Sequence, residues 1–337
     1  MAEIEVREIR SDEYRVWDEL VTNSPQGTVF HLSDWAITCA SLSHKRPLLL
    51  GYYEDGYLTG GCLLYATAKS SFISFADSRA LMTPYGGYLL PESASTKVRE
   101  RESQNRSIVL AISDEISKQG FASVSIVSAP AFQDIRPLIW DGWTSSTYYT
   151  YVLPLVEDIS SHISKKTRNT IRKGLKNDVQ VSKCYDPEIY WDLTISTYEK
   201  QDREPPFTKM FLMGMFDMIM GNNLGEMWIA KMPTGEAAAA EFVTWDNHMA
   251  HRWSAASNFA HRDTGATSLL LFEIFLDLQE RGFDSINLMA GNTPHLSMFV
   301  SSFNPELIPY YGVKKTRFWV DVARLFGRTM EIGGAKK

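Results

Sequence analysis

The chain alternates between two hydrophobic patterns, one with the period of a strand and one with the period of a helix. Residues 4–9 alternate as in a half-buried strand, and apolar runs at 48–53 and 57–65 flank Asp55-Gly56, the strongest short hairpin signal. Helices are predicted to begin at Ser11 and Ser33 and to fill about 95–118, and a strand at 122–127 follows. This half therefore mixes helices with antiparallel strands.

The second half of the chain repeats that order. Strands are predicted at 179–181, 227–232, 236–245, 248–257, 285–288 and 308–313, and helices at 187–200, 208–220 and 266–281. The turn Pro233-Thr234-Gly235 follows the opening strand of its half at nearly the same distance as Asp55-Gly56 does. The pattern predicts an α+β unit used twice, with domains at 1–155 and 156–325 and a flexible tail at 326–337.

Composition supports a soluble two-domain protein. The 337 residues are 44% hydrophobic and 22% charged, and at roughly 150 residues per domain this length predicts two domains. No apolar stretch approaches the ~18–20 residues that span a bilayer, and the first residues lack the pattern of a signal peptide. Three widely spaced cysteines and scattered histidines predict neither disulfides nor a metal site. We expect a cytoplasmic protein without a membrane span.

The net charge of −6 opposes extensive nucleic-acid binding, yet one segment is strongly basic. Residues 165–176 carry six Lys and Arg residues and no acid. One helical face holds Lys165, Arg168, Arg172 and Lys176, and another holds Ile159, Ile163, Ile171 and Leu175. This segment is either a solvated amphipathic helix between domains or a clamp for a phosphate-bearing ligand. In the second interpretation Arg168 and Arg172 bind the ligand, because guanidinium groups pair well with phosphate.

A second informative segment, residues 258–267, lies between a predicted strand and the long helix. Amides at a helix N-terminus attract anions, and glycine lets the backbone approach a phosphate. The segment is therefore a candidate anion site. The alternative is a tight loop in which Thr264 caps the helix.

These motifs resemble a known family. Arg262-x-x-Gly265-x-Thr267 before a helix resembles the acyl-CoA pyrophosphate loop of the GNAT N-acyltransferases, although that family prefers Gly or Ala at the last position. A longer ordered set resembles the FemAB/FemX-like branch: the run 166–173, the strand 253–257, the helix closed by Gly282, and the stretch 299–310. The resemblance implies two tandem GNAT-like (acyl-CoA N-acyltransferase) domains, each a mixed, mostly antiparallel sheet flanked by helices. It further implies an acyl-CoA donor and an amine acceptor, and it makes Arg262, Gly265, Ala266 and Thr267 the candidate residues that bind the phosphates of this cofactor.

Two positions depart from the aminoacyl-tRNA-dependent members of that branch. Val300 follows Phe299 where those members usually have a lysine, and Asn287 stands in a strand where an acid is common. Both changes remove charge from the expected reaction groove, so they weigh against aminoacyl transfer from tRNA.

Attack of an amine on an activated acyl carbon needs a base and a proton donor for the leaving group. Glu241 is the candidate base. In the alternative interpretation, Glu241 is an acid on the strand face that pairs with a lysine. Tyr310 or Tyr311 is the candidate proton donor. In the alternative interpretation, these tyrosines only pack against neighbouring residues. The residues expected to bind substrate, besides the two arginines of the basic segment, are Tyr198, Arg203, Trp253, Ser257 and Asn287.

Three functions stay open. The first is an acyl-CoA-dependent N-acyltransferase acting on an amine, such as a small molecule, a peptide or an amino sugar. The second is a FemX-like aminoacyl-tRNA-dependent transferase, which the basic segment favours. The third is a catalytically silent binding protein that keeps the fold. A hydrolase is disfavoured, because the chain lacks a Gly-x-Ser-x-Gly elbow and strand alternation points Ser254 away from His251.

Overall fold

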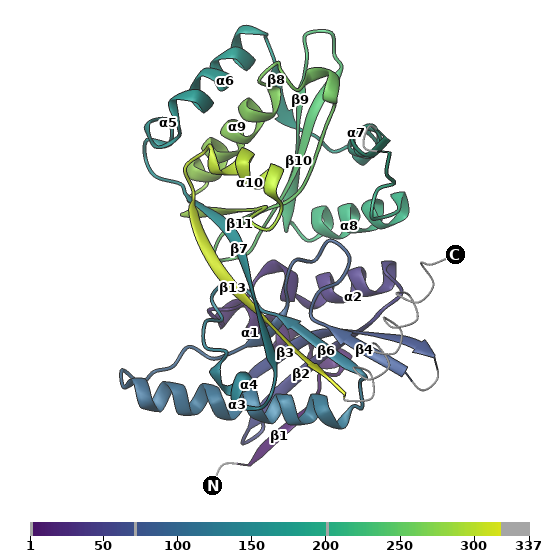
Figure 1. Ribbon diagram of the computed structural model, residues 1–337, viewed down its shortest axis with the longest axis vertical. Helices are drawn as coiled ribbons and strands as arrows, with labels where there is room; N and C mark the ends of the chain where they lie inside the picture. Colours follow the sequence, from purple (N-terminus) through teal and green to yellow (C-terminus); the bar gives the residue numbers. More distant parts are fainter. Residues whose placement is uncertain (1–2, 71–72, 200–201, 318–337) are drawn as a thin grey trace, which may run out of the picture. The chain divides into compact units, whose positions relative to one another are not determined.

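The computed structural model describes residues 3–70, 73–199 and 202–317 (Figure 1). The chain divides into two compact units. Unit 1 comprises Met1–Thr147 together with the chain from Tyr310 onward, and unit 2 comprises Tyr148–Pro309. The chain passes between the units within two strands, β7 (Thr144–Pro154) and β13 (Glu306–Thr316).

Unit 1 is an α+β unit whose strands run in the order β1-β2-β3-β4-β6-β13, with β5 beside β3. Its strands are β1 (Ile4–Glu8), β2 (Arg46–Glu54), β3 (Tyr57–Ser70), β4 (Ile73–Asp77), β5 (Gly87–Leu89) and β6 (Ser123–Val127). Its helices are α1 (Tyr14–Asn23), α2 (Ser33–Leu42), α3 (Val98–Lys118) and α4 (Arg136–Trp140), with short 3-10 turns at Ser11–Glu13 and Val29–His31. Among the named strands described in this unit only β4 and β6 pair in parallel, and an isolated parallel bridge joins Gly86 to Ser128.

Two apolar clusters cover the sheet of unit 1. The first packs α3 through Ile108, Ile112 and Ile116 against strand residues that include Leu48 and Ile126. The second packs α1 and α2 against β2 and β3. The predicted hairpin is confirmed, since Glu54 pairs with Tyr57 across a turn in which Asp55 and Gly56 both have positive φ.

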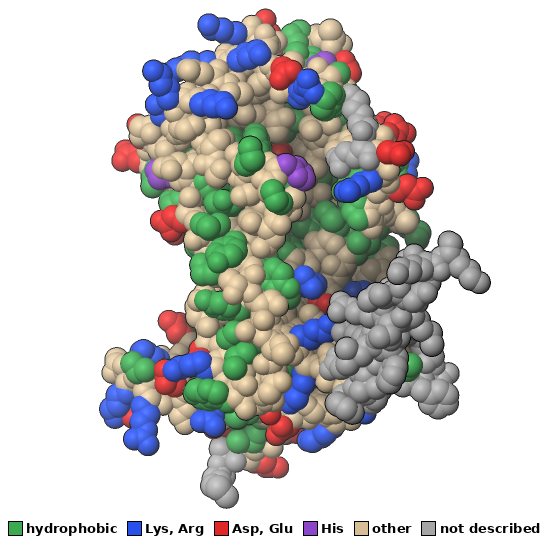
Figure 2. Space-filling view, in the orientation of Figure 1, with side chains coloured by type: hydrophobic (Ala, Val, Ile, Leu, Met, Phe, Trp, Pro, Cys, Tyr) green, Lys and Arg blue, Asp and Glu red, His purple; other side chains and the backbone are tan. Residues whose placement is uncertain are grey.

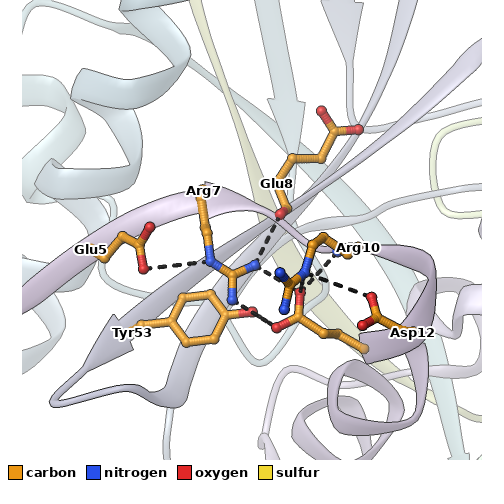
Figure 3. Close-up of polar contacts among 7 residues, drawn as sticks. Glu5, Arg7, Glu8, Arg10, Asp12 and Tyr53 are labelled. Atoms are coloured by element: carbon orange, nitrogen blue, oxygen red, sulfur yellow. Dashed lines mark hydrogen bonds and ion pairs between the residues drawn. The ribbon is translucent and has the colours of Figure 1, made fainter.

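A compact group of charged side chains fixes the start of unit 1 (Figure 3). The Arg7 guanidinium donates two hydrogen bonds of 2.7 Å to the carboxylate of Glu13, and it lies 4.1 Å from the centroid of the Tyr53 ring. The bond with Arg7 lowers the pKa of Glu13 to about 2, and burial opposes this. These contacts join β1 to the turn that precedes α1.

Unit 2 has the strand order β7-β12-β11-β10-β9-β8. Its other strands are β8 (Gln180–Lys183), β9 (Gly225–Lys231), β10 (Ala237–Trp245), β11 (Ala250–Ser257) and β12 (Ser285–Met289). Its helices are α5 (Ile159–His162), α6 (Lys165–Lys176), α7 (Pro187–Glu199), α8 (Lys209–Gly221), α9 (Ala266–Glu280) and α10 (Pro294–Ser301), with a 3-10 turn at Phe259–His261. The β11–β12 pairing is parallel, and the other pairings described in this unit are antiparallel.

Helix α9 is the central helix of unit 2. It is apolar because it packs on α6 on one side and on β8–β10 on the other (Figure 1). Helices α7 and α8 pack against each other, α7 also against β10 and β11, and α8 against β9. The second predicted hairpin is confirmed as well, with Gly235 at φ +86° between β9 and β10.

Three of the differences from the sequence-based expectations concern the domain boundary, one strand and the basic segment. The domains were expected to meet near Leu155, and 310–325 was assigned to the second domain. The units instead divide at Thr147 and the chain returns to unit 1 at Tyr310, because the end of β13 pairs with β6. The strand β7 was not predicted. The tail 326–337 lies outside the described residues.

The basic segment is the third difference. A single helix lined by four apolar residues was expected, but the chain forms α5 and α6 with extended backbone at Ile163 and a cap at Ser164. Ile159, Ile163 and Ile171 are buried as expected, whereas Leu175 is 55% exposed. Ile171 and Leu175 belong to the same helix, α6, whose buried positions are Thr167, Ile171 and Gly174, so the predicted apolar face does not extend to Leu175.

Candidate functional site

The first candidate region is the start of α9. Gly265 precedes the helix with φ +89°, and a Cβ there would lie 2.4 Å from the Thr170 carbonyl oxygen and 2.6 Å from the Gly174 nitrogen. Asn177 donates its side-chain amide to the Thr264 carbonyl at 2.9 Å. The glycine is therefore required by the close approach of α6, independently of any ligand.

Other residues of this loop occupy different environments. Ala266 is buried, and its N–H donates to the Thr264 hydroxyl at 3.2 Å. The N-cap of α9 is Gly265 and no side chain among the described residues caps the helix, so Thr264 does not have the capping role that was considered from sequence. Thr267 is half-buried on the first turn. Arg262 is exposed; its guanidinium contacts Asp263 at 3.2 Å and lies 4.0 Å from the centroid of the Phe259 ring. Of the four candidate phosphate-binding residues, Arg262 alone carries a charge, and its guanidinium faces solvent.

The second candidate region is α6, where Lys and Arg side chains gather on the surface (Figure 2). Arg168 donates hydrogen bonds to three carbonyls, those of Ser160, Ser161 and Ile163, and so caps α5. Arg172 is exposed and donates to the Asn169 side chain. The two arginines therefore differ, because Arg168 is engaged by backbone carbonyls whereas Arg172 points outward. The other exposed cations of α6 are Lys165, Lys166, Lys173 and Lys176.

Glu241 lies on β10 and is 1% exposed. Both of its carboxylate oxygens accept hydrogen bonds from Arg252 of β11, at 2.8 and 2.6 Å. Burial raises the pKa of the carboxyl, and the guanidinium opposes that rise. The partner is an arginine and not the lysine considered from sequence. This geometry favours a buried ion pair over a general base, because both oxygens are already bonded.

A bulge in β11 rearranges the residues around this pair. Phe242 pairs with Ser254 but Val243 pairs with Arg252, so Trp253 is the extra residue. Trp253 is 8% exposed, and its ring meets Phe242 edge to face at 5.2 Å.

The bulge corrects one expectation. Thr244 pairs with His251, and Phe242 and Thr244 share a face of β10, so Ser254 and His251 lie on the same face rather than on opposite faces. The two side chains have separate partners, however. Ser254 accepts from the Tyr190 hydroxyl at 2.5 Å, and His251 contacts Asp246 at 2.7 Å.

Asn287 is fully buried on β12. Its side-chain oxygen accepts from the Thr150 hydroxyl at 2.6 Å and from the Met289 N–H at 2.9 Å. Met289 and Ala290 follow with positive φ, so Asn287 holds a strained turn at the end of the strand. Val300 is also fully buried in the unit 2 core, which accounts for an apolar residue at this position.

The ends of α7 and β11 are brought together. Thr197 donates its hydroxyl to the Ser257 carbonyl at 2.9 Å and accepts from the Ser257 N–H at 3.2 Å. Tyr198 is the next residue of α7, and its carbonyl accepts from the N–H of the exposed Arg203. Three candidate substrate-binding residues, Tyr198, Arg203 and Ser257, therefore cluster in unit 2.

The candidate proton donors belong to the other unit. Tyr310 is 8% exposed and lies edge-on to Tyr85, with centroids 6.1 Å apart. The Tyr311 carbonyl accepts from the Ser128 N–H. Sequence reasoning missed the Arg252 partner of Glu241 and the bulge at Trp253, although the pairing of an acid and a base on neighbouring predicted strands was a usable signal.

Among residues 3–70, 73–199 and 202–317, no cluster of three or more His, Cys, Asp or Glu side chains is arranged to hold a metal ion. No helix in the same ranges is both long and apolar enough to cross a membrane.

The sequence and structure match known proteins at two levels. Residues 163–296 match the family model of the acetyltransferase (GNAT) domain. No curated protein sequence matches the chain. The crystal structure of FemX is similar at a TM-score of 0.70 and 11% identity, over 91% of this chain and 96% of that one.

Two further structures share the fold. A tandem GNAT protein from the clavulanic acid biosynthesis pathway matches at a TM-score of 0.56 and 12% identity, over 93% of this chain and 98% of that one. L-PGS from Bacillus licheniformis matches at a TM-score of 0.56 and 11% identity, over 94% and 95% of the two chains. At sequence identities of 11–12% these similarities establish the fold alone. The resemblance to the FemAB/FemX-like GNAT branch is confirmed, and so is the expected α+β fold with tandem GNAT-like domains.

Proposed function

We propose that this protein is an N-acyltransferase that moves an acyl group from acyl-CoA to an amine. The observation that carries the proposal is the start of α9 within the GNAT-matched segment, where Arg262 faces solvent beside the N-terminus of a 15-residue helix. A helix N-terminus favours negative charge, and a guanidinium adds charged hydrogen bonds to phosphate. The similar tandem GNAT protein is described in a form without acetyl-CoA, so acetyl-CoA is the ligand associated with it, which supports the same donor class here.

The reaction fixes what the site must do. The amine nitrogen attacks the acyl carbon, the carbon–sulfur bond breaks, the amine loses a proton and the leaving sulfur gains one. Tyr310 or Tyr311 remains the proposed donor of that last proton, and Tyr198, Arg203 and Ser257 the proposed border of the acceptor site. Glu241 is the weaker candidate for the base, since its bidentate bond to Arg252 leaves no carboxylate oxygen unbonded.

Ligand-dependent melting tests the donor. At 100 times its dissociation constant a ligand adds about 2.7 kcal/mol to folded-state stability, a shift of roughly 5–10 °C for a domain of 150–250 residues. Acetyl-CoA is expected to raise the melting temperature of the wild type. Arg262→Gln is expected to reduce the shift while leaving the ligand-free melting temperature unchanged, because the side chain is exposed. Arg15→Gln, which removes another exposed arginine, is the matched control and should keep the full shift.

If coenzyme A and several acyl-CoAs leave the wild-type melting temperature unmoved at millimolar concentration, the acyl-CoA proposal fails. If the melting temperature rises, acyl transfer is then measured with a panel of amines. Binding without turnover on any amine would move the silent binding protein ahead of the enzyme.

The second candidate is a FemX-like aminoacyl-tRNA-dependent transferase. The observation that favours it is the set of five exposed cations on α6, none of which pairs with an acid among the described residues: Lys165, Lys166, Arg172, Lys173 and Lys176. Charged tRNA binding through this face is expected to weaken steeply as salt rises. Salt-independent binding, or no binding at low salt, would remove this candidate.

A further inference from the structure

Unit 1 contains a cavity of about 400 Å³ that the candidate transferase site does not use. It lies at the end of α3, between that helix, the start of β6 and the end of β13. Four buried apolar residues, Ile116, Phe121, Val124 and Trp143, form its walls, and Ser117, Lys315, Thr316 and Arg317 complete the lining. Its volume is within the range of small-molecule sites, which are mostly apolar with a few polar groups.

Most of the polar groups in the lining are already bonded inside the protein. Ser117 donates its hydroxyl to a carbonyl of its own helix at 2.9 Å, and the Thr316 hydroxyl contacts that of Ser123 at 3.1 Å. Lys315 pairs with Asp141 at 2.9 Å. The ammonium and the carboxylate neutralise each other, so these groups add little net charge to the site.

The carboxylate of Asp141 is held by three hydrogen-bond donors. It accepts from the Ser113 hydroxyl at 3.1 Å and from the Trp143 indole N–H at 3.1 Å, as well as from Lys315. Burial opposes ionisation, but the bonds from Lys315 and Trp143 outweigh it and lower the pKa of Asp141. The indole is thereby fixed in orientation, with its ring forming part of the cavity wall.

Arg317 is the remaining charge. It is exposed, and among the described residues no acid pairs with it. The N–H of Arg317 donates to the Ala122 carbonyl at 3.0 Å, which ties its backbone to the start of β6. The cavity therefore combines apolar walls with one net positive charge at its edge.

We propose that this cavity binds a small monocarboxylate with an apolar body, independently of the proposed transferase activity. The apolar body packs against Trp143, Phe121 and Ile116, and the carboxylate accepts hydrogen bonds from the Arg317 guanidinium. Guanidinium and carboxylate match each other in a bidentate geometry. At ~30 Å³ for each water-sized group, the volume holds on the order of ten non-hydrogen atoms.

Binding of 3-phenylpropionate to the full-length protein, measured by isothermal titration calorimetry, tests this proposal. The probe has an apolar ring and one carboxylate, and 3-phenylpropionamide is its neutral isostere. Saturable binding of one acid per chain is expected, and the amide should bind at least about tenfold more weakly because the charged hydrogen bonds are lost. Arg317→Gln should weaken acid binding by a similar factor, whereas Arg99→Gln, an exposed arginine on α3 outside the lining, should not.

A blocking variant tests the location. Ser117 is exposed on α3 and lines the cavity, so Ser117→Trp should fill it and abolish binding. Ser107→Trp is the matched control, since Ser107 is exposed on the same helix and donates the same kind of intrahelical hydrogen bond at 3.0 Å. Equal affinity for acid and amide, full binding by Ser117→Trp, or no saturable binding to the wild type would each overturn the proposal.

Discussion

Replacing Gly265 by alanine tests whether this glycine serves packing or ligand binding. Its φ of +89° costs a non-glycine residue about 1–2 kcal/mol. The added Cβ would lie 2.4 Å from the Thr170 carbonyl oxygen and 2.6 Å from the Gly174 nitrogen. Both are backbone atoms of α6, so relief requires the helix to move, and overpacking of this kind costs about 1–3 kcal/mol. Gly265→Ala is therefore expected to destabilise unit 2 by about 2–5 kcal/mol.

Gly282 provides a matched control at the other end of α9. Its φ is +88°, and a Cβ there meets no atom within 4 Å. Gly282→Ala thus carries the backbone cost without the packing cost. The difference between the two variants isolates the contact with α6 and should amount to about 1–3 kcal/mol.

The chain has two units, so the measurement must report on unit 2 by itself. Hydrogen exchange of peptides from α6 and α9 gives their local opening free energies, and urea unfolding of the full chain supplies an independent value. Equal opening free energies for the two variants, within about 0.5 kcal/mol, would refute the packing argument. An alanine variant that is as stable as the wild type but no longer responds to acetyl-CoA would assign Gly265 to the ligand instead.

Three further substitutions have defined outcomes. Arg252→Met should destabilise unit 2 by about 3–5 kcal/mol in urea unfolding, because Glu241 is left buried without a partner; adding Glu241→Leu should recover most of the loss. Glu13→Gln should cost about 1–2 kcal/mol at neutral pH, discounted for solvent screening. Because bonding to Arg7 lowers the pKa of Glu13 from 4.5 to about 2, its contribution is present above pH 4.5 and is lost as the pH falls toward 2; acid titration of both proteins should converge there. Asn287→Ala should lower the melting temperature, because a buried hydroxyl and a backbone amide each lose an acceptor at about 1–3 kcal/mol.

The elements with strong local signals were predictable from the sequence. The hairpins at Gly56 and Gly235 and the long helix closed by Gly282 depend on turn chemistry and on an apolar run, which neighbouring residues determine. The strand β7 was missed, and so was the return of β13 to unit 1. The pairing of β13 with β6 joins residues almost two hundred positions apart, and no local pattern encodes it.

The candidate site was less predictable because contacts between elements decide which of its residues are buried. The buried positions of α6 are Thr167, Ile171 and Gly174, which leaves Leu175 at the surface although it follows Ile171 by one turn. The bulge at Trp253 adds one residue to β11. Residues that follow it therefore lie on the opposite face of the sheet from the one that simple alternation predicts from the residues before it. Glu241 meets Arg252 only through the register of β10 on β11, and sequence alternation alone did not identify this partner.

The surroundings of Gly265 also limit what the loop motif says about the donor. Phosphate approach and helix packing both select glycine, and here the backbone of α6 already occupies the space that a Cβ would fill. The presence of Gly265 therefore does not distinguish an acyl-CoA donor from an aminoacyl-tRNA donor. The charged residues near it provide the test instead. Binding through Arg262 and a helix N-terminus involves few phosphates, so acetyl-CoA binding should depend weakly on salt. Binding of tRNA across the five exposed cations of α6 predicts a slope of roughly −3 to −5 in log affinity against log salt, from −0.7 to −0.9 per phosphate contact. A shallow slope with tRNA would contradict the use of α6 as its docking face, and a steep slope with acetyl-CoA would contradict docking at Arg262 alone.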